Sequence, residues 1–565
     1  MSKCFNKKRV TILKSPGVPR CGSVPQQRVR FQLPSLQLDQ VFSSFTKREN
    51  TKPYEELVLT LRDSELQDGD LEQLLHCVRQ CVPVLDESLH HFVNAFLKIK
   101  WLHRSDGVVV AYQDFLVELV SAHNYYIVSV LEALVSGFSE VLSSNEWEDS
   151  QPTQKEVDCY ARIHSVLLVL LKVVPMSGEK LVQAVVKKFP YLKVSPHEQE
   201  SFLYNVMHVV DQQPMLAKDL MLLVVSRLVA LDVSMPCSSQ EEGQGEVFQM
   251  EDPGSGHTLD VLMCALLHHV RKRCSTGWEG AKTAYSLQLH AFERAVLPTH
   301  ATGYAQFLMF YACSFRLTLA EAFIDFLWRV ATAISRPSVI RQAAATYLAS
   351  FLARASYVTL NMLKSTLAEM AAWIHKYISN QEDLESVNLD VRLHGVFYFI
   401  CQAVFYVVAF RHTDLVDSRK NLTFLQSLGL AQMVTCVLNP LRVCQPVLVR
   451  RFAAVTRTHQ LAYCYTVMER NARSTMPVIY MDDMGLAVST ATYLEAVFPY
   501  DPLHIPRCRS IIAPFYREFD DMDLSEDEPN DVEEASGHLQ EDNDDFLDDM
   551  SLGTSAPEML SVSMQ

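Results

Sequence analysis

The stretch PSVIRQAAATYLASFLARASYV, from Pro337 to Val358, decides the fold class of this chain. Its apolar side chains recur at steps of three and four residues and therefore line one face of a helix, namely Ile340, Ala344, Leu348, Phe351, Leu352 and Ala355. Pro337 suits the first turn, because the backbone N–H that it lacks would have no partner there. We predict one helix over this stretch, with Gln342 and Ser350 mostly on the opposite side and Arg341 and Arg354 facing solvent or a partner.

Similar apolar patterns alternate with short breaks along most of the chain. They run over residues 39–233 and 258–519, on either side of the Gly-, Ser- and Glu-rich segment 234–257, which we expect to be a flexible inserted loop. Helix pairs that recur about every 40 to 47 residues are typical of HEAT and armadillo repeats, and no strand-like alternation recurs. We therefore predict an all-α, HEAT/armadillo-like helical-repeat solenoid with disordered termini.

Charge is concentrated at the two ends of the 565-residue chain. Residues 520–565 contain sixteen acidic and no basic residues, so this tail alone accounts for the formal net charge of −16. Residues 1–38 form a basic, proline-containing segment. We predict that both ends are disordered. The uncharged, almost wholly apolar run Gly395–Phe410 is too short for a membrane span and predicts a buried helix, and we expect no membrane association.

Cysteine and histidine residues form one cluster that resembles a metal site, made by His76, Cys77, Cys81, His90 and His91. Paired CxxC ligands are absent from it, and leucine and valine residues surround it, so we favour ordinary core residues over a zinc site. The fourteen cysteines lie singly, most of them in apolar runs, which is typical of reduced core residues.

Nucleotide-binding, esterase and metalloprotease signatures are missing, since the chain has no Walker loop, GxSxG or HExxH motif. We therefore expect no catalytic residues, no metal and no cofactor. A cryptic hydrolase or metalloenzyme would need an unfamiliar site.

Five segments in order resemble one protein family. They are LPTHATGYAQFLMFYACSF (297–315), the stretch quoted above, LHGVFYFICQAVFYVVAFRH (393–412), LNPLRVCQPVLVRRFAAV (438–455) and FPYDPLHIPRCRSIIAPFYREF (498–519). WLHRSDGVVVAYQDFLVELVSA (101–122) resembles the same family more loosely. Together these segments are similar to the RNA polymerase I-specific transcription initiation factors, and the likeness covers roughly residues 50–519.

The resemblance implies a bridging protein of the nucleus and nucleolus that also shuttles to the cytoplasm. Its partners would be the stalk-side subunits of RNA polymerase I, the promoter selectivity or core factor, and regulatory protein kinases, with self-association of the free protein. The sequence leaves direct DNA contact open. The alternative is a generic α-solenoid nuclear adaptor or transport receptor without polymerase specificity, and co-purification with polymerase subunits would separate the two.

Three serines are candidate regulatory phosphorylation sites. Ser15 precedes Pro16 in the basic segment, where the family has a proline-directed site, and Ser525 precedes a run of acidic residues. Ser177 lies in a break between helices, where relatives carry phosphorylatable hydroxyls. We predict Ser177 to be an exposed loop residue. The acidic tail itself is either a solvated segment that confers solubility or one that docks on a basic surface and screens it from nucleic acid.

Overall fold

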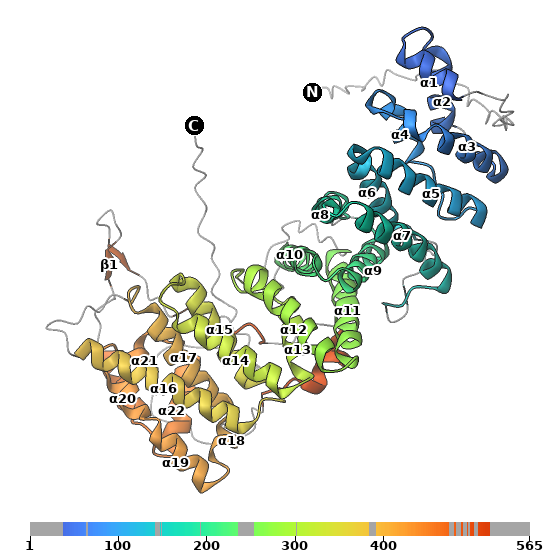
Figure 1. The fold of residues 1–565 in the computed structure, drawn as a ribbon. Coiled ribbons are helices and arrows are strands. Elements are labelled where there is room, and N and C mark those ends of the chain that lie inside the picture. The colour runs from blue at the N-terminus through green and yellow to red at the C-terminus, as the bar shows by residue number, and fades with distance from the viewer. Residues whose placement is uncertain are drawn as a thin grey trace, which may run out of the picture. The chain divides into compact units, whose positions relative to one another are not determined.

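The computed structural model describes residues 38–63, 66–141, 147, 150–191, 194–234, 254–300, 302–382, 391–473, 479–481, 487–489, 494, 498–501 and 507–519. The described chain divides into two compact units, Met1–Ser129 and Val130–Gln565. Helices dominate both (Figure 1), so the predicted all-α class is confirmed. The basic segment 1–38, apart from Leu38, and the acidic tail 520–565 lie outside the described residues.

The first unit is built from short and medium helices. These are α1 (Leu38–Thr46), α2 (Lys52–Asp63), α3 (Asp68–Gln80), α4 (His90–Phe96) and α5 (Asp106–Ala122), with 3-10 turns at Val82–Val84, Glu87–Leu89 and Asn124–Tyr126. Its core is aromatic, because the ring of Phe96 packs against both Tyr112 and Phe115 of α5. Helix α6 (Ile127–Ser136) contains the boundary between the units.

The second unit opens with long helices. These are α7 (Gln154–Val173), α8 (Ser177–Lys188), α9 (Pro196–Gln212), α10 (Ala217–Ser234), α11 (Gly254–Ser275) and α12 (Trp278–Ala291), which a π-helical turn extends (Phe292–Val296). Local sequence sets their starts. The backbone N–H of Thr153 donates to the Glu156 carboxylate at 2.9 Å in a capping box, and Ser195 caps α9 ahead of Pro196.

Helices α13 to α17 form the densest part of the second unit. They are α13 (Phe307–Ser314), α14 (Leu317–Thr332), α15 (Ser338–Arg354), α16 (Leu360–Glu382) and α17 (Gly395–Phe410). Shorter helices follow: α18 (His412–Val416), α19 (Arg419–Ser427), α20 (Leu430–Thr435), α21 (Pro440–Val443), α22 (Pro446–Thr458), α23 (Cys464–Arg473) and α24 (Arg509–Ile512). Two 3-10 turns also belong to this unit, one after α6 (Gly137–Ser139) and one after α24 (Ala513–Phe515).

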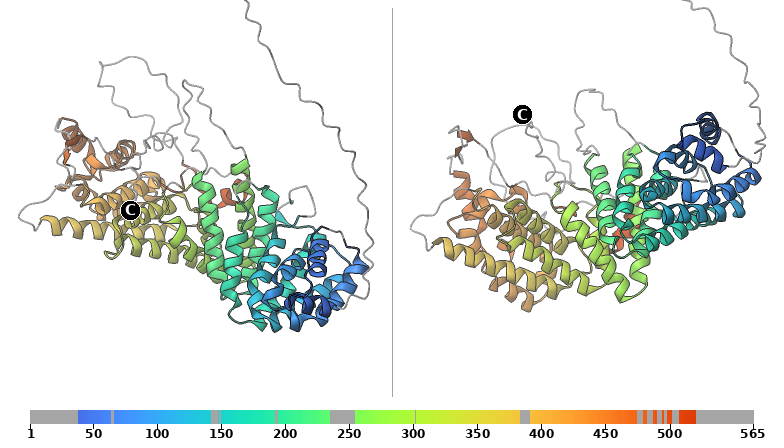
Figure 2. Two further views of the ribbon diagram at one scale, coloured as in Figure 1. Left: turned by 90° about the horizontal axis from the view of Figure 1, so that it is seen from above. Right: turned by 45° about the horizontal axis from the view of Figure 1, so that its top comes forward.

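Helices α14 to α17 pack as two antiparallel pairs. The Arg341 side chain at the start of α15 donates to the Ala331 carbonyl at the end of α14, and Tyr377 near the end of α16 bonds His394, just before α17. Helices α15 and α17 are parallel neighbours, since Gln342 lies beside Gly395 at one end and Arg354 over Phe410 at the other. Figure 2 shows these helices from two further sides. Repeat proteins stack helix pairs in this way.

Helix α17 is buried from Gly395 to Phe410 except at Phe399, which is half-buried, as its apolar run predicts. Among the described residues, no helix combines the length and the apolar character needed to cross a bilayer.

Two features of the fold differ from the sequence-based expectation. Most of the predicted loop 234–257 lies outside the described residues, but α11 begins at Gly254, and it packs against α9, α10 and α12. This segment therefore does not separate two compact halves. A short antiparallel hairpin also occurs, although the sequence shows no recurring strand-like alternation, with β1 (Ile479–Met481) paired to β2 (Ala487–Ser489).

Candidate protein-interaction surfaces

The signature helix α15 is buried on all sides in its second half. Every residue from Ala344 to Arg354 is buried, because α14, α17 and the segment 498–519 surround it. The predicted core positions Ala344, Leu348 and Phe351 are confirmed. The amphipathic interpretation of the helix is wrong, since Ser350 is buried as well. Pro337 precedes the helix as its N-cap residue instead of lying in the first turn.

Arg354 holds the C-terminal segment against the repeat. Its side chain is 2 % exposed and forms an ion pair with Asp501, which is equally buried. The guanidinium also lies 4.4 Å from the ring centroid of Phe410 and donates to the Arg517 carbonyl at 3.2 Å. The prediction that Arg354 faces solvent or a partner is therefore wrong. Helical periodicity placed Arg354 away from the apolar face. It could not show that a carboxylate 147 residues further along the chain pairs with this arginine.

Tyrosine and serine side chains complete this contact, which we call the Arg354 hub. The Tyr406 hydroxyl of α17 donates to Asp501, and burial raises the pKa of that phenol, with the Asp501 charge adding to the rise. The hydroxyl therefore stays protonated and remains a donor. Ser350 accepts a hydrogen bond from the Tyr500 backbone N–H at 3.0 Å. The motif 498–501, which the sequence marked only by family likeness, thus supplies both a buried charge and a buried ring.

Arg341 has a different environment. Its side chain is half-buried, and its Nε donates to the Ala331 carbonyl oxygen at 2.9 Å, so it satisfies the C-terminal end of α14. Partner contact by the remaining guanidinium nitrogens stays a prediction.

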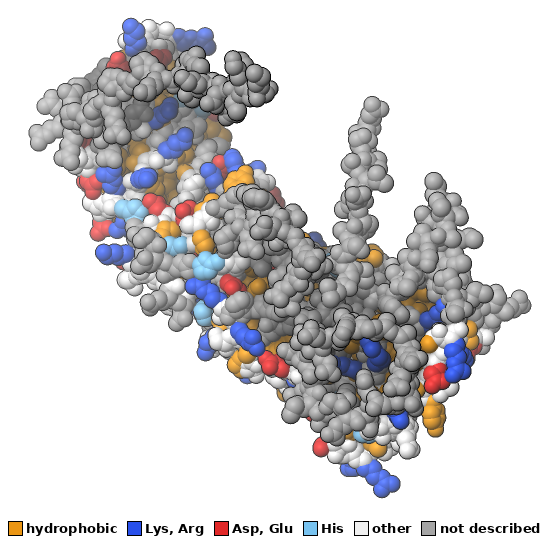
Figure 3. All heavy atoms as spheres, turned by 180° about the vertical axis from the view of Figure 1, so that it is seen from behind, with side chains coloured by type: hydrophobic (Ala, Val, Ile, Leu, Met, Phe, Trp, Pro, Cys, Tyr) orange, Lys and Arg blue, Asp and Glu red, His pale blue; other side chains and the backbone are white. Residues whose placement is uncertain are grey.

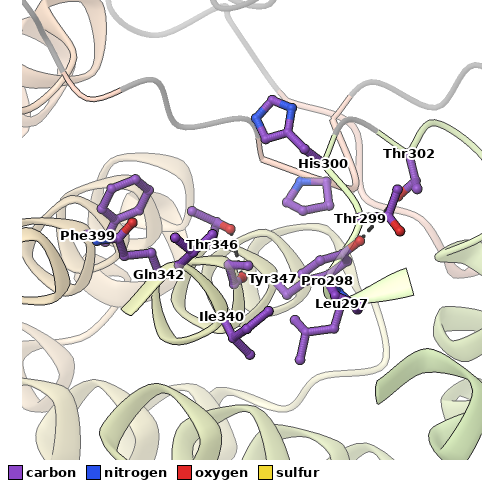
Figure 4. A pocket seen from close by; sticks show the side chains of 13 residues that line it. Leu297, Pro298, Thr299, His300, Thr302, Ile340, Gln342, Thr346, Tyr347 and Phe399 are labelled. Carbon is purple, nitrogen blue, oxygen red and sulfur yellow. Dashed lines mark hydrogen bonds between the residues drawn. The ribbon is translucent and has the colours of Figure 1, made fainter. Parts of the chain in front are cut away.

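A cavity of about 200 Å³ opens beside the start of α15. Figure 4 shows α15 side chains, among them Ile340 and Tyr347, between Phe399 of α17 on one side and the segment 297–302 on the other. Val339 in its wall is 69 % exposed. Cavities for drug-sized ligands measure about 300 to 1,000 Å³, so this one is smaller than a typical small-molecule site.

Ser177 lies at the first position of α8 and is buried, with 1 % of its surface exposed. Its hydroxyl donates to the Val174 carbonyl at 2.5 Å. The prediction of an exposed loop serine is therefore wrong, because the break between helices is a tight corner in which the serine closes the turn. A kinase would reach this hydroxyl only after the corner opens. Ser15 and Ser525 lie outside the described residues.

The same corner exposes large apolar side chains. Met176 is 76 % exposed beside Ser177, and Val169 and Val173 lie on the exposed side of α7. The turn between α9 and α10 is adjacent, since Leu216 lies 3.1 Å from the position of a Cβ on Gly178, and it exposes Met215 at 89 %. We call the four side chains Val169, Val173, Met176 and Met215 the corner patch. Sequence analysis missed it, although Met176 stands in the break that it identified.

Contiguous exposed apolar side chains mark protein-interaction sites, and methionine adapts its shape to a partner. On the face in Figure 3, the described part of the surface carries basic and acidic side chains interspersed, with hydrophobic and histidine side chains among them. This distribution agrees with the balanced charge of residues 1–519.

The histidine and cysteine cluster of the first unit contains no metal-ligand geometry. Cys81 is buried and its thiol donates to Asp39 at 3.0 Å, while the ring centroids of His90 and His91 lie 3.8 Å apart with the rings tilted by 40°. Within the described residues, no three His, Cys, Asp or Glu side chains converge in a way that could hold a metal ion. The cysteines that the structure describes are free thiols, mostly buried.

Stacked helix pairs with an exposed apolar corner define an all-α helical protein with a candidate protein-interaction surface. A family model described as "RNA polymerase I specific transcription initiation factor RRN3" matches residues 35–255 and 237–524. The chain therefore belongs to the RRN3 family of RNA polymerase I-specific transcription initiation factors, and the resemblance noted in the sequence is confirmed.

Individual relatives agree with this assignment. The mouse RNA polymerase I-specific transcription initiation factor RRN3 is 32 % identical over 575 residues, covering 93 % of this chain and 86 % of the mouse protein. The fission yeast factor rrn3 (Schizosaccharomyces pombe) is 24 % identical and covers 83 % and 84 %. These relatives are named as initiation factors and not as enzymes. The crystal structure of RNA polymerase I transcription initiation factor Rrn3 has the same fold, with a TM-score of 0.69 at 19 % identity, over 85 % of this chain and 97 % of that one.

Proposed function

We propose that this protein binds RNA polymerase I in its initiation-competent form and recruits it to the promoter-bound selectivity or core factor for ribosomal RNA synthesis. It would act in the nucleus and nucleolus and shuttle to the cytoplasm. Phosphorylation would regulate the association, and the free protein would self-associate. The relatives are named as RNA polymerase I-specific initiation factors, which supports the polymerase and the initiation step. The recruitment step rests on the bridging role that the family resemblance implies.

The observation that carries this proposal is the corner patch. Met176 and Met215 leave most of their apolar surface in water, on neighbouring turns that the packing of Gly178 against Leu216 holds together. Burying such side chains in a partner releases roughly 25 cal/mol per Å² of apolar surface. The underlying helices are rigid and short-looped, so little ordering is needed on binding. We propose that this patch contacts the stalk-side subunits of the polymerase.

A pull-down with purified RNA polymerase I tests the patch. We expect the variant Met176→Ser/Met215→Ser to recover at least fivefold less polymerase than the unmodified protein. The matched control is Ile334→Ser/Val339→Ser, which removes two similarly exposed apolar side chains, one in the turn before α15 and one in its first turn. Equal polymerase recovery by all three proteins would exclude the corner patch.

Promoter-dependent transcription tests the function itself. An extract depleted of this protein should fail to initiate at a ribosomal promoter, and adding the protein back should restore initiation. Elongation by purified polymerase I on nonspecific templates should not change. Normal initiation by the depleted extract would reject the function, whichever surface binds the polymerase.

A further inference from the structure

The last helices of the second unit carry an excess of positive charge. Residues 411–473 contain nine Lys and Arg but only three Asp and Glu. Helix α22, PVLVRRFAAVTRT, has three arginines and no acidic residue. This local excess contrasts with the balanced charge of residues 1–519 as a whole, so it marks one region that favours anionic partners.

Two of the three arginines of α22, Arg450 and Arg457, are exposed, and the half-buried Arg451 lies beside them. Arg450 and Arg457 are seven residues apart, which places them on the same side of the helix about 10 Å apart along its axis. Both are exposed, and neither forms an ion pair with a described residue. Arg457 lies 5.5 Å from the ring centroid of Tyr465 in α23, which supports one end of the stripe. We call Arg450, Arg451 and Arg457 the α22 stripe.

The C-terminal segment ends at this stripe. Phe519 is the last described residue, and its ring lies 4.8 Å from the Arg451 guanidinium and 5.0 Å from the Phe410 ring. Arg517 fixes the approach, because its guanidinium forms an ion pair with Asp414 at 3.0 Å and its backbone N–H donates to the Arg354 carbonyl at 2.7 Å. The chain after Phe519 therefore starts beside the α22 stripe.

The sequence that follows has the opposite charge. Residues 520–528 read DDMDLSEDE and contain six carboxylates. Nine extended residues span up to about 30 Å, which exceeds the length of the stripe. Tethering gives the tail an effective concentration in the millimolar range, so even a weak charge interaction is populated.

We propose that the acidic tail of this chain, through residues 520–528, docks on the α22 stripe and covers it. The occupant is the chain's own tail because the tail begins at the stripe and carries complementary charge. A phosphate on Ser525 would add nearly two negative charges to the docked segment and strengthen the contact. Another anionic partner, such as nucleic acid, would have to displace the tail before reaching the arginines.

Photo-crosslinking in the full-length chain tests this proposal. p-Benzoylphenylalanine replaces Leu524, the protein is irradiated in about 50 mM salt, where surface charges are weakly screened, and mass spectrometry locates the crosslinks. A mixture of isotopically light and heavy protein separates contacts within one chain from contacts between copies. We expect intrachain crosslinks to α22 or α23, and at least a fivefold loss in about 0.5 M salt.

Charge reversal makes the test specific. Arg450→Glu/Arg457→Glu should reduce the crosslink at least fivefold, and adding Asp520→Lys/Asp521→Lys/Asp523→Lys should restore it. The control Arg419→Glu/Lys420→Glu makes the same change in charge on exposed side chains of α19, and it should retain the crosslink. Circular dichroism checks that each variant is folded.

Three outcomes would overturn the proposal. They are crosslinks mainly between different chains, crosslinks mainly to other helices, and an equal loss in the α19 control. An equal loss in the α19 control would mean that the tail responds to the overall positive charge of this region and does not bind the α22 stripe specifically.

Discussion

The Arg354 hub and the corner patch are opposite in almost every respect. The hub is a buried charge between segments far apart in the chain, and it lies in the motifs with the strongest family likeness. The corner patch consists of exposed methionine and valine side chains at adjacent turns, in unremarkable sequence. The comparison shows that the recognisable family motifs of this chain form buried contacts within the chain itself. Surfaces for partners need a different signal, which is apolar area left in water.

The largest expected effect is on the hub. Arg354→Leu leaves the Asp501 carboxylate buried without its ion-pair partner, and we expect it to lower the free energy of unfolding by about 3–5 kcal/mol. Chemical denaturation followed by circular dichroism measures this. Adding Asp501→Asn should recover part of the loss, because the buried charge is then removed. A single variant that unfolds like the unmodified protein would show that the hub does not hold the segment.

Substitutions of Ser177 test whether its side chain is buried at the corner between α7 and α8. Ser177→Glu places a longer, charged side chain in a buried site, and we expect a loss of about 2–3 kcal/mol in the free energy of unfolding. Ser177→Ala removes only the hydrogen bond to Val174 and should cost about 1 kcal/mol. If the two variants melt alike, the serine is more accessible than its position in α8 indicates.

His164 gives the second unit a pH-dependent stability. Burial, with a smaller contribution from His208, lowers the pKa of its imidazole to about 4. Its Nε2 forms a hydrogen bond with the side-chain oxygen of Asn205 at 2.9 Å. The unfolded chain therefore binds a proton that the folded chain excludes, so stability falls as the pH drops from about 6.5 towards 4. The loss at pH 5 should be about 2 kcal/mol. Denaturation at pH 7 and pH 5 measures it.

The variant His164→Gln supplies the control for this effect. Glutamine keeps a polar group near Asn205 but does not titrate, so its stability should differ less between the two pH values. An unchanged difference would assign the pH dependence to other groups, such as His208, whose pKa burial also lowers.

The smallest effect is expected at the corner patch. Met176→Ser/Met215→Ser alters side chains that are mostly in water, so the free energy of unfolding should change by no more than about 0.5 kcal/mol. Thermal denaturation checks this. A larger loss would mean that the methionines are packed, and it would remove the contrast with the Arg354 hub.

The all-α class and the core of α15 and α17 could be predicted from the sequence, because apolar periodicity and uninterrupted apolar runs are local signals. The partner of Arg354 could not, since Asp501 lies 147 residues away and no local pattern encodes that pairing. Periodicity assigns a charged residue to solvent by default, and a tertiary ion pair overrides that assignment.

Ser177 and the corner patch show a second limit. A proline and a glycine around a serine predict a break in the helix, and the break is there. Whether the serine side chain lies inside or outside the turn depends on the hydrogen bond to Val174 and on the packing of the next corner. The exposure of Met215 depends in the same way on neighbouring helices, so composition alone could not predict it.

The separation between Arg354 and its partner also has a consequence for synthesis. When the ribosome completes α15, the Asp501 carboxylate that pairs with its buried charge is still 147 positions from being made. At about 5 to 20 residues per second, this interval lasts roughly 7 to 30 s. Over that time Arg354 and Ser350 have neither Asp501 nor Tyr500 to bind. We therefore expect the nascent second unit to stay incompletely packed, and accessible to chaperones, until its C-terminal segment leaves the exit tunnel.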